Sequence, residues 1–238
     1  MNRCLGRLPS KHDARTIRLH AIRTPGLPPP PPERRWDKAV PQFSLGGNDR
    51  YGNCVIVCAA NIQLNMRAAA TSDTSQIADA AIIALSREMD ALNGYNILDR
   101  LKYWRRNTMW ANRLWAFAQI DYANIQEIKA TVDALGAADI GVRLANAWRD
   151  SNTWNDGHGR QYEPGSWGLH SVPIVGYDTT AAYVASWGDV ITFPWDAVPK
   201  YCDEAYALID PAWIEPDAEA PNFLDLDALH AALQAVAA

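Results

Sequence analysis

Two residues that lie far apart in the chain are a candidate thiol nucleophile and its base. Cys54 follows the turn-forming pair Gly52-Asn53 and precedes an apolar run, 55–70, that predicts a helix. A cysteine attacks only as the thiolate, and a helix N-terminus and a neighbouring imidazole both favour that charged form. His170, in an apolar stretch typical of a buried strand, is the candidate base. The pair predicts thiol-dependent cleavage of an amide or ester bond.

A purely structural interpretation of both residues also fits the sequence. Free cysteines are commonly small buried packing residues, and a single histidine in an apolar strand usually has a structural role. Because only the fold can bring residues this distant together, the chemistry depends on the elements that carry them.

Helical and strand periodicities alternate along the chain. Helices are predicted over 55–70, 75–93, 98–104 and 125–135. Strands are predicted over 114–120, 138–144, 170–177, 181–187, 190–193 and 204–209. This order predicts an α+β fold, with a helical subdomain packed against an antiparallel β-sheet or half-barrel. Cys54 and His170 then come from different halves.

Several motifs follow one another in an order that resembles the papain-like cysteine peptidase superfamily. The matching positions are Asn48, Gly52, Cys54, His170, Val172, Gly176, Tyr177 and Ser186-Trp187-Gly188. The opening stretch 6–15 is also similar to that of bacterial papain-like proteins, and the likeness covers roughly residues 5–210. The stretch 47–54 looks closest to uncharacterised papain-like proteins of bacteria and their phages.

The resemblance implies a papain-like fold with a cleft between its halves. Cys54 would be the nucleophile and His170 its base, while the Cys54 backbone amide and the Asn48 side chain would hold the oxyanion. Gly52 would lie against substrate. The Trp187 ring would shield the catalytic hydrogen bond from water, and the alternative is a core aromatic.

Two departures from the family pattern concern the catalytic machinery. Asn48 stands where the family has glutamine, and its alternative role is that of a turn residue. Ala185 stands where the family has the asparagine that orients the histidine. Ser186 is the nearest polar substitute and Asp189 another candidate. We therefore expect a Cys-His dyad, an orienting group from elsewhere, or a weakened enzyme.

The stretch 148–168 precedes His170 and is rich in Asn, Asp, Gly and Trp. We expect it to line the cleft or bind substrate, with Trp154, Tyr162 and Trp167 available for stacking. A disordered surface connection is the alternative.

Proline content suggests how the chain is organised. Residues 28–32 are five consecutive prolines, which predict a stiff polyproline II segment. It would act as a strap across the body or as a ligand for proline-binding modules. We expect an N-terminal arm over 1–40, a papain-like domain over 41–214, and a C-terminal linker and short amphipathic helix over 215–238.

Composition limits the classes of partner that the chain is expected to bind. A net charge of −5 leaves no basic footprint, so nucleic acid is not an expected partner. No stretch approaches the ~20 apolar residues of a membrane span, and no signal peptide is recognisable, so a cytoplasmic or virion-associated location is expected. The cysteines at 4, 54, 58 and 202 have no zinc-site spacing, and no metal or cofactor is predicted.

Three functions remain open. A cysteine peptidase or related amide hydrolase, acting on a peptide or peptide-like substrate through a thioester, agrees best with the motifs. A catalytically inactive papain-like module, serving binding or phage structure, is favoured by Ala185. A transferase would pass the same thioester to an amine. The sequence leaves the oligomeric state open.

Overall fold

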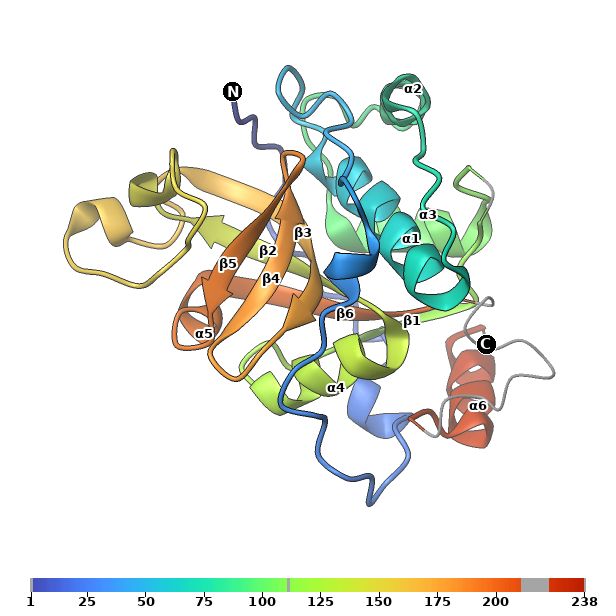
Figure 1. Cartoon of the computed structure of the whole chain (residues 1–238). Coiled ribbons are helices and arrows are strands. Elements are labelled where there is room, and N and C mark those ends of the chain that lie inside the picture. The colour runs from blue at the N-terminus through green and yellow to red at the C-terminus, as the bar shows by residue number, and fades with distance from the viewer. Residues whose placement is uncertain (1, 111, 211–222, 238) are drawn as a thin grey trace.

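A computed structural model describes residues 2–110, 112–210 and 223–237, and divides them into a helical half and a sheet half. The helical half contains α1 (Cys54–Thr71), α2 (Asp79–Glu88) and α3 (Ile97–Arg106). Figure 1 shows these helices gathered on one side of the sheet, with α1 running along its face. The first turn of α1 therefore lies at the boundary between the halves.

The sheet half is one six-stranded antiparallel sheet with strand order β1-β6-β2-β3-β4-β5. Its strands are β1 (Ala116–Gln119), β2 (Ala138–Leu144), β3 (Gly168–Tyr177), β4 (Ala181–Ser186), β5 (Asp189–Pro194) and β6 (Cys202–Ile209). Helix α4 (Ile125–Leu135) covers part of the sheet, and the short α5 (Val198–Tyr201) precedes β6. Short 3-10 turns occupy Leu19–Ala21, Trp36–Ala39, Asn146–Trp148 and Arg160–Tyr162.

Helix α1 is buried on nearly all sides, because it packs between the sheet and the other helices. Its buried residues include the polar Asn61 and Asn65. Asn61 bonds both ways with the backbone of Ser44, and Asn65 donates to the carbonyl of Gly136 at 2.8 Å. A buried amide costs free energy unless it is hydrogen-bonded, so these pairs fix the position of α1.

A buried ion pair joins the two halves behind the first turns of α1. Arg100 of α3 pairs with Asp139 of β2, and both side chains are inaccessible to solvent. The other carboxylate oxygen of Asp139 accepts from Cys58 of α1 at 3.2 Å and from Ser171 of β3 at 3.5 Å. Two helices and two strands therefore share one polar cluster in the core.

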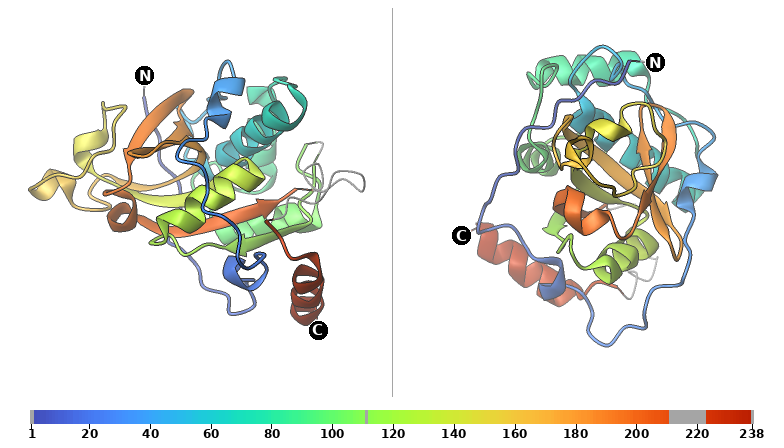
Figure 2. Two further views of the ribbon diagram at one scale, coloured as in Figure 1. Left: turned by 60° about the horizontal axis from the view of Figure 1, so that its bottom comes forward. Right: turned by 90° about the vertical axis from the view of Figure 1, so that its left-hand side faces the viewer.

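The segment before α1 wraps around the molecule, as the blue trace in Figure 2 shows. Arg34 pairs with Tyr177 through backbone bonds of 2.9 and 2.7 Å, so this segment extends the sheet locally. The Tyr177 hydroxyl donates to the carbonyl of Pro31. A Cβ on Gly176 would lie 2.4 Å from Asp37, which explains a glycine beside Tyr177. The polyproline segment is held against the body at this end.

Helix α6 (Leu226–Ala237) lies beside the first 3-10 turn. The backbone of Thr24 donates to Phe223, and that of Asp225 donates to Ile22, so the start of α6 is tied to the N-terminal arm. Most of the linker predicted before this helix lies outside the described residues. No helix in the described parts of the chain is both long and apolar enough to cross a bilayer.

The predicted α+β fold class is confirmed, and the predicted helices and strands occur with small shifts at their ends. The helix predicted over 75–93 was too long, because regular structure spans only Asp79–Glu88. Asp90 and Gly94 have φ values of 54° and 129°, so the chain turns repeatedly before α3. Apolar periodicity continued through these turns and hid the end of the helix.

Candidate active site

Cys54 is the first residue of α1, at the helix start that the sequence predicts. Asn53 occupies the N-cap position without a capping bond from its side chain. Its amide donates instead to the carbonyl of Gly46 at 2.9 Å and to the Ser86 hydroxyl at 3.2 Å. The first amides of a helix have no intrahelical acceptors, so those of Cys54 and Val55 remain available to a negative charge.

His170 lies in β3 with its ring held on two sides. Nε2 is 2.7 Å from Oγ of Ser186, and the ring stacks on Trp187 with centroids 4.3 Å apart and planes 9° apart. Nδ1 is buried and has no hydrogen-bond partner among the described residues. One nitrogen is therefore fixed by a hydroxyl, and the other is left for a further group.

The turn between β4 and β5 positions both of those contacts. Ser186 pairs with Asp189, so Trp187 and Gly188 form a two-residue hairpin loop. Their φ values are 49° and 82°, and two successive positive values are characteristic of a type I′ turn. Glycine adopts this conformation freely whereas tryptophan does not, so the Trp187 backbone is strained. This turn places the indole against His170.

The sulfur of Cys54 lies beside the strand that carries His170. Burial raises the pKa of the Cys54 thiol to about 11, while backbone hydrogen bonds from Ser171, Gly6 and Val55 and the charge of Arg7 act to lower it. Ser171 follows His170 directly, so the thiol contacts the backbone of the strand residue next to His170.

Burial also sets the charge of the imidazole. It lowers the pKa of His170 to about 3, and the positive charges of Arg7 and Arg3 add to that effect. At neutral pH the resting site therefore holds a neutral thiol and a neutral imidazole. Both residues are only 1% exposed.

The cover over the site is the chain's own N-terminal segment, residues 2–8. Its backbone bonds to both sides of the site: Cys4 N–H donates to Asn48, Arg7 N–H to Leu169, Tyr95 N–H to Gly6, and Leu8 N–H to Tyr95, at 2.8–3.3 Å. The Trp187 indole donates to the carbonyl of Cys4 at 3.3 Å. Gly6 lies directly against Gly52, since a Cβ added to Gly6 would come within 1.7 Å of the Gly52 carbonyl oxygen.

Two arginines anchor this segment at its ends. Arg3 donates to Ser151 O at 2.9 Å and to Asn152 Oδ1 at 2.6 Å, and lies over the Trp187 ring. Arg7 pairs with Asp203 at 2.8 Å and with Glu204 at 2.6 Å. The catalytic pair predicted from sequence is thus covered by a segment that sequence reasoning assigned only to an arm. In the sequence, only the glycine at position 6, between Leu5 and Arg7, could have indicated that this segment packs closely against the site.

Asn48, Ala185 and Asp189 have contacts in this structure that involve neither His170 nor an oxyanion. The Asn48 amide donates to the carbonyl of Tyr51 at 2.9 Å and to Asn53 at 3.5 Å, so in this state it is engaged within its own loop. Ala185 packs among apolar side chains with Phe43 and Val175. Asp189 is exposed at the start of β5.

The aromatic residues of 148–168 divide between core and site. Trp154 is fully buried and stacks on Trp148, so the suggestion that it stacks on substrate was wrong. Trp167 is half-buried and stacks on Trp187 at 5.5 Å. The Arg149 guanidinium also lies over the Trp167 ring, 5.6 Å from its centroid. The ring of Trp167 thus extends the aromatic wall that begins at His170.

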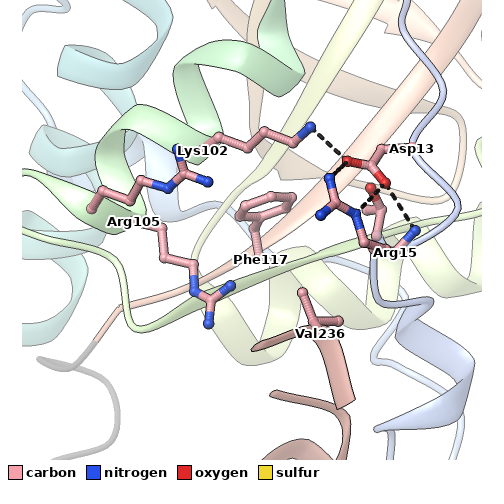
Figure 3. A pocket seen from close by; sticks show the side chains of 8 residues that line it. Asp13, Arg15, Lys102, Arg105, Phe117 and Val236 are labelled. Atoms are coloured by element: carbon pink, nitrogen blue, oxygen red, sulfur yellow. Dashed lines mark hydrogen bonds and ion pairs between the residues drawn. The ribbon is translucent and has the colours of Figure 1, made fainter. Parts of the chain in front are cut away.

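A hollow of about 390 Å³ borders the Trp187 side of the site, lined by Gln42, Phe43, Ser44, Leu45, Gln76, Asp79, Trp187, Gly188 and Asp189. A larger hollow, of about 460 Å³, lies elsewhere. Figure 3 shows that Asp13 pairs there with Arg15 and Lys102, and that Phe117 and Val236 of α6 also line this hollow. It contains none of the predicted site residues.

Within the described ranges, no three His, Cys, Asp or Glu side chains are grouped to hold a metal ion.

Solved structures of cysteine proteases share this architecture. Xylellain from Xylella fastidiosa is 13% identical with a TM-score of 0.65 over 88% of this chain and 98% of its own. The Carica candamarcensis protease CMS1MS2, in complex with E-64, is 16% identical with a TM-score of 0.55 over 75% and 98%.

A third structure, digestive procathepsin L 3 of Tenebrio molitor larval midgut, is 12% identical with a TM-score of 0.55 over 87% and 76%. No family model and no curated protein matches the sequence. At these identities the likeness concerns the fold, and the chain adopts the papain-like fold of cysteine proteases.

Proposed function

We propose that the chain is a thiol-dependent amide hydrolase of the cysteine peptidase type, with Cys54 as nucleophile and His170 as base. One observation carries the proposal: the ring of His170 is fixed at Nε2 by Ser186, while Nδ1 has no partner among the described residues. A base held at one nitrogen and open at the other is what nucleophile activation requires.

The reaction would proceed in two stages. His170 takes the thiol proton, and Cys54 attacks the substrate carbonyl carbon. The backbone amides at the uncapped start of α1 stabilise the negative oxygen. Collapse of this intermediate breaks the carbon–nitrogen bond, and the imidazolium gives its proton to the leaving amine. Water, deprotonated by His170, then attacks the thioester carbon. The carbon–sulfur bond breaks, the acid product leaves, and the imidazolium returns its proton to the Cys54 sulfur.

Ser186 would be a positioning residue, and Trp187 would keep water from the His170–Ser186 hydrogen bond. Gly52 would face bound substrate, since Gly6 lies against it now, and Trp167 would do so beside Trp187. Asn48 is the weakest member of the proposed site, because its amide must leave the Tyr51 carbonyl before it reaches an oxyanion.

Access is the condition for activity, because substrate cannot reach side chains that are 1% exposed. Residues 2–8 must therefore leave the cleft before a peptide enters. The resting chain would be latent, with a peptide or peptide-like substrate as its expected partner.

Labelling with a thiol-directed peptide electrophile tests the proposal, in a chain whose residues 2–8 are displaced by Gly6→Ala. We expect a covalent adduct on Cys54 by mass spectrometry, which is lost in Cys54→Ala and reduced in His170→Ala. The matched control is Cys58→Ala, which alters the other α1 thiol and should still be labelled. Labelling of Cys58 in place of Cys54 would contradict the assignment.

An inactive binding module is the second candidate, and the buried state of Cys54 and His170 favours it. The absence of any adduct after residues 2–8 are displaced would support this candidate. Addition of amine acceptors to a turnover assay would distinguish hydrolysis from transfer of the thioester.

A further inference from the structure

The side chain of Arg7 enters a pocket beside the proposed catalytic pair. Its guanidinium is fully buried and makes two ion pairs, Nη1 with Oε1 of Glu204 and Nη2 with Oδ2 of Asp203. The Glu204 and Asp203 side chains are 2% and 22% exposed. We call these two carboxylates and the space between them the acidic pocket.

An irregularity in the sheet creates this pocket. In β6, Glu204 pairs with Gly141 and Cys202 with Val142, so Asp203 is an extra residue at the register shift. Successive side chains of a regular strand point to opposite faces, whereas a bulge redirects one of them. The bulge therefore lets two adjacent carboxylates reach the same guanidinium.

Gly141 provides the room for an arginine. A Cβ at this position would lie 2.9 Å from Nη1 of Arg7 and 2.7 Å from Cγ of Glu204. Any larger residue would fill the space that the guanidinium uses. The two carboxylates at the bulge and the space left by Gly141 together form a binding site for a cation.

The residue in the acidic pocket, Arg7, directly follows the residue that lies over Cys54. Gly6, which precedes Arg7, lies on Gly52 and directs its backbone amide at the Cys54 sulfur. The Arg7 backbone donates to Leu169, which precedes His170. A chain lying over Cys54 therefore delivers the side chain of its next residue to the acidic pocket.

Removal of residues 2–8 would leave the pocket without its cation. Glu204 is buried, Asp203 adds negative charge beside it, and the Tyr206 hydroxyl donates to its second oxygen at 3.0 Å. Once Arg7 has gone, the Tyr206 hydroxyl alone does not compensate the negative charge of two adjacent carboxylates. Another cationic group is the occupant that restores the balance.

We propose that the acidic pocket recognises the substrate, by binding a basic side chain of the residue adjacent to the one that lies over Cys54. Arginine is preferred to lysine, because its two terminal nitrogens match the two carboxylates as those of Arg7 do. This specificity rests on the proposed function of the cleft, and the test below separates the two.

The experiment uses the full-length chain with Gly6→Ala, whose methyl group cannot fit against Gly52 and so displaces residues 2–8. Three peptidyl vinyl sulfones are compared, which differ only in the residue next to the reactive one: arginine, its neutral isostere citrulline, or leucine. We expect the arginine probe to label Cys54 at least about tenfold faster than citrulline, since a buried charge pair is lost in the latter.

Glu204→Gln and Asp203→Asn, each added to Gly6→Ala, should bring the arginine-to-citrulline ratio close to one. Asp189→Asn is the matched control, since it neutralises an exposed carboxylate near Trp187 and should leave the ratio unchanged. Equal labelling by arginine and citrulline probes would overturn the proposal, even if both carboxylate variants failed to fold.

A binding measurement covers the case in which no probe labels Cys54. Calorimetry on Gly6→Ala/Cys54→Ala, with arginine and citrulline forms of one unreactive peptide, measures affinity for the pocket without any reaction at Cys54. Preference for the arginine peptide there would support the pocket and contradict the proposed function. With no labelling either, equal affinities would contradict both the pocket and the proposed function.

Discussion

The backbones of Gly6 and Gly52 lie in direct contact next to Cys54. A Cβ on Gly6 would come within 1.7 Å of the Gly52 carbonyl oxygen, and a Cβ on Gly52 would lie 2.8 Å from the carbonyl oxygen of Leu5. No positive φ is involved at either residue, so the demand for glycine is steric. The cover over Cys54 thus depends on the absence of two side chains.

Gly6→Ala should expose the thiol. We expect iodoacetamide to modify Cys54 at pH 7 at least about tenfold faster than in the unmodified chain, because the added methyl group prevents close packing and admits water. Leu8→Ala is the matched control, since Leu8 is 47% exposed. Equal rates in Gly6→Ala and the unmodified chain would mean that residues 2–8 do not limit access.

The pH dependence of Cys54 modification should differ between these two chains. Burial is the main cause of the raised pKa, and a pKa of about 11 leaves about one thiol in ten thousand ionised at pH 7. Modification of the resting chain should therefore keep rising above pH 9.

Hydration in Gly6→Ala removes much of this effect, lowers the thiol pKa and raises that of His170 above its resting value of about 3. The midpoint of its pH profile should move to lower pH. Superimposable profiles, measured by mass spectrometry, would contradict this account.

Ser186→Ala should impair catalysis through His170. The substitution removes the partner of Nε2 and should lower kcat roughly 10- to 100-fold in Gly6→Ala, with a smaller change in KM. Ser186→Thr keeps the hydroxyl and should restore most of the activity. A role limited to packing would instead affect thermal stability in both variants and leave kcat unchanged.

Asp139→Ala should destabilise the fold strongly. It leaves the Arg100 charge buried without a partner and should lower the free energy of unfolding by about 3–5 kcal/mol in urea titrations. Cys58→Ala removes only a weak donor to the same carboxylate and should cost about 1–2 kcal/mol.

Asp133→Ala provides the control for Asp139→Ala. The Arg34 and Asp133 side chains are 38% and 25% exposed, so solvent screens this pair and the loss should be below about 1 kcal/mol. Similar losses for Asp139→Ala and Asp133→Ala would show that the buried pair has no special role in joining the halves.

Local sequence patterns determined the elements and the two most important positions of the candidate site. Apolar periodicity placed α1, α4 and most strands within a few residues, because helix and strand repeats differ strongly. Cys54 at a helix start and His170 in a strand could be predicted for the same reason, since each depends on its immediate neighbours.

Only the tertiary structure decided what surrounds these positions. The bond between Ser186 and His170, the packing of Trp154 against Trp187 and the pairing of Arg7 with Asp203 and Glu204 join distant parts of the chain. The Asn48 amide turns into its own loop, which the residue type alone did not reveal. Such contacts leave no periodic trace in the sequence. They depend on register, bulges and close backbone approach, which are settled when the sheet, the helices and the N-terminal segment pack together.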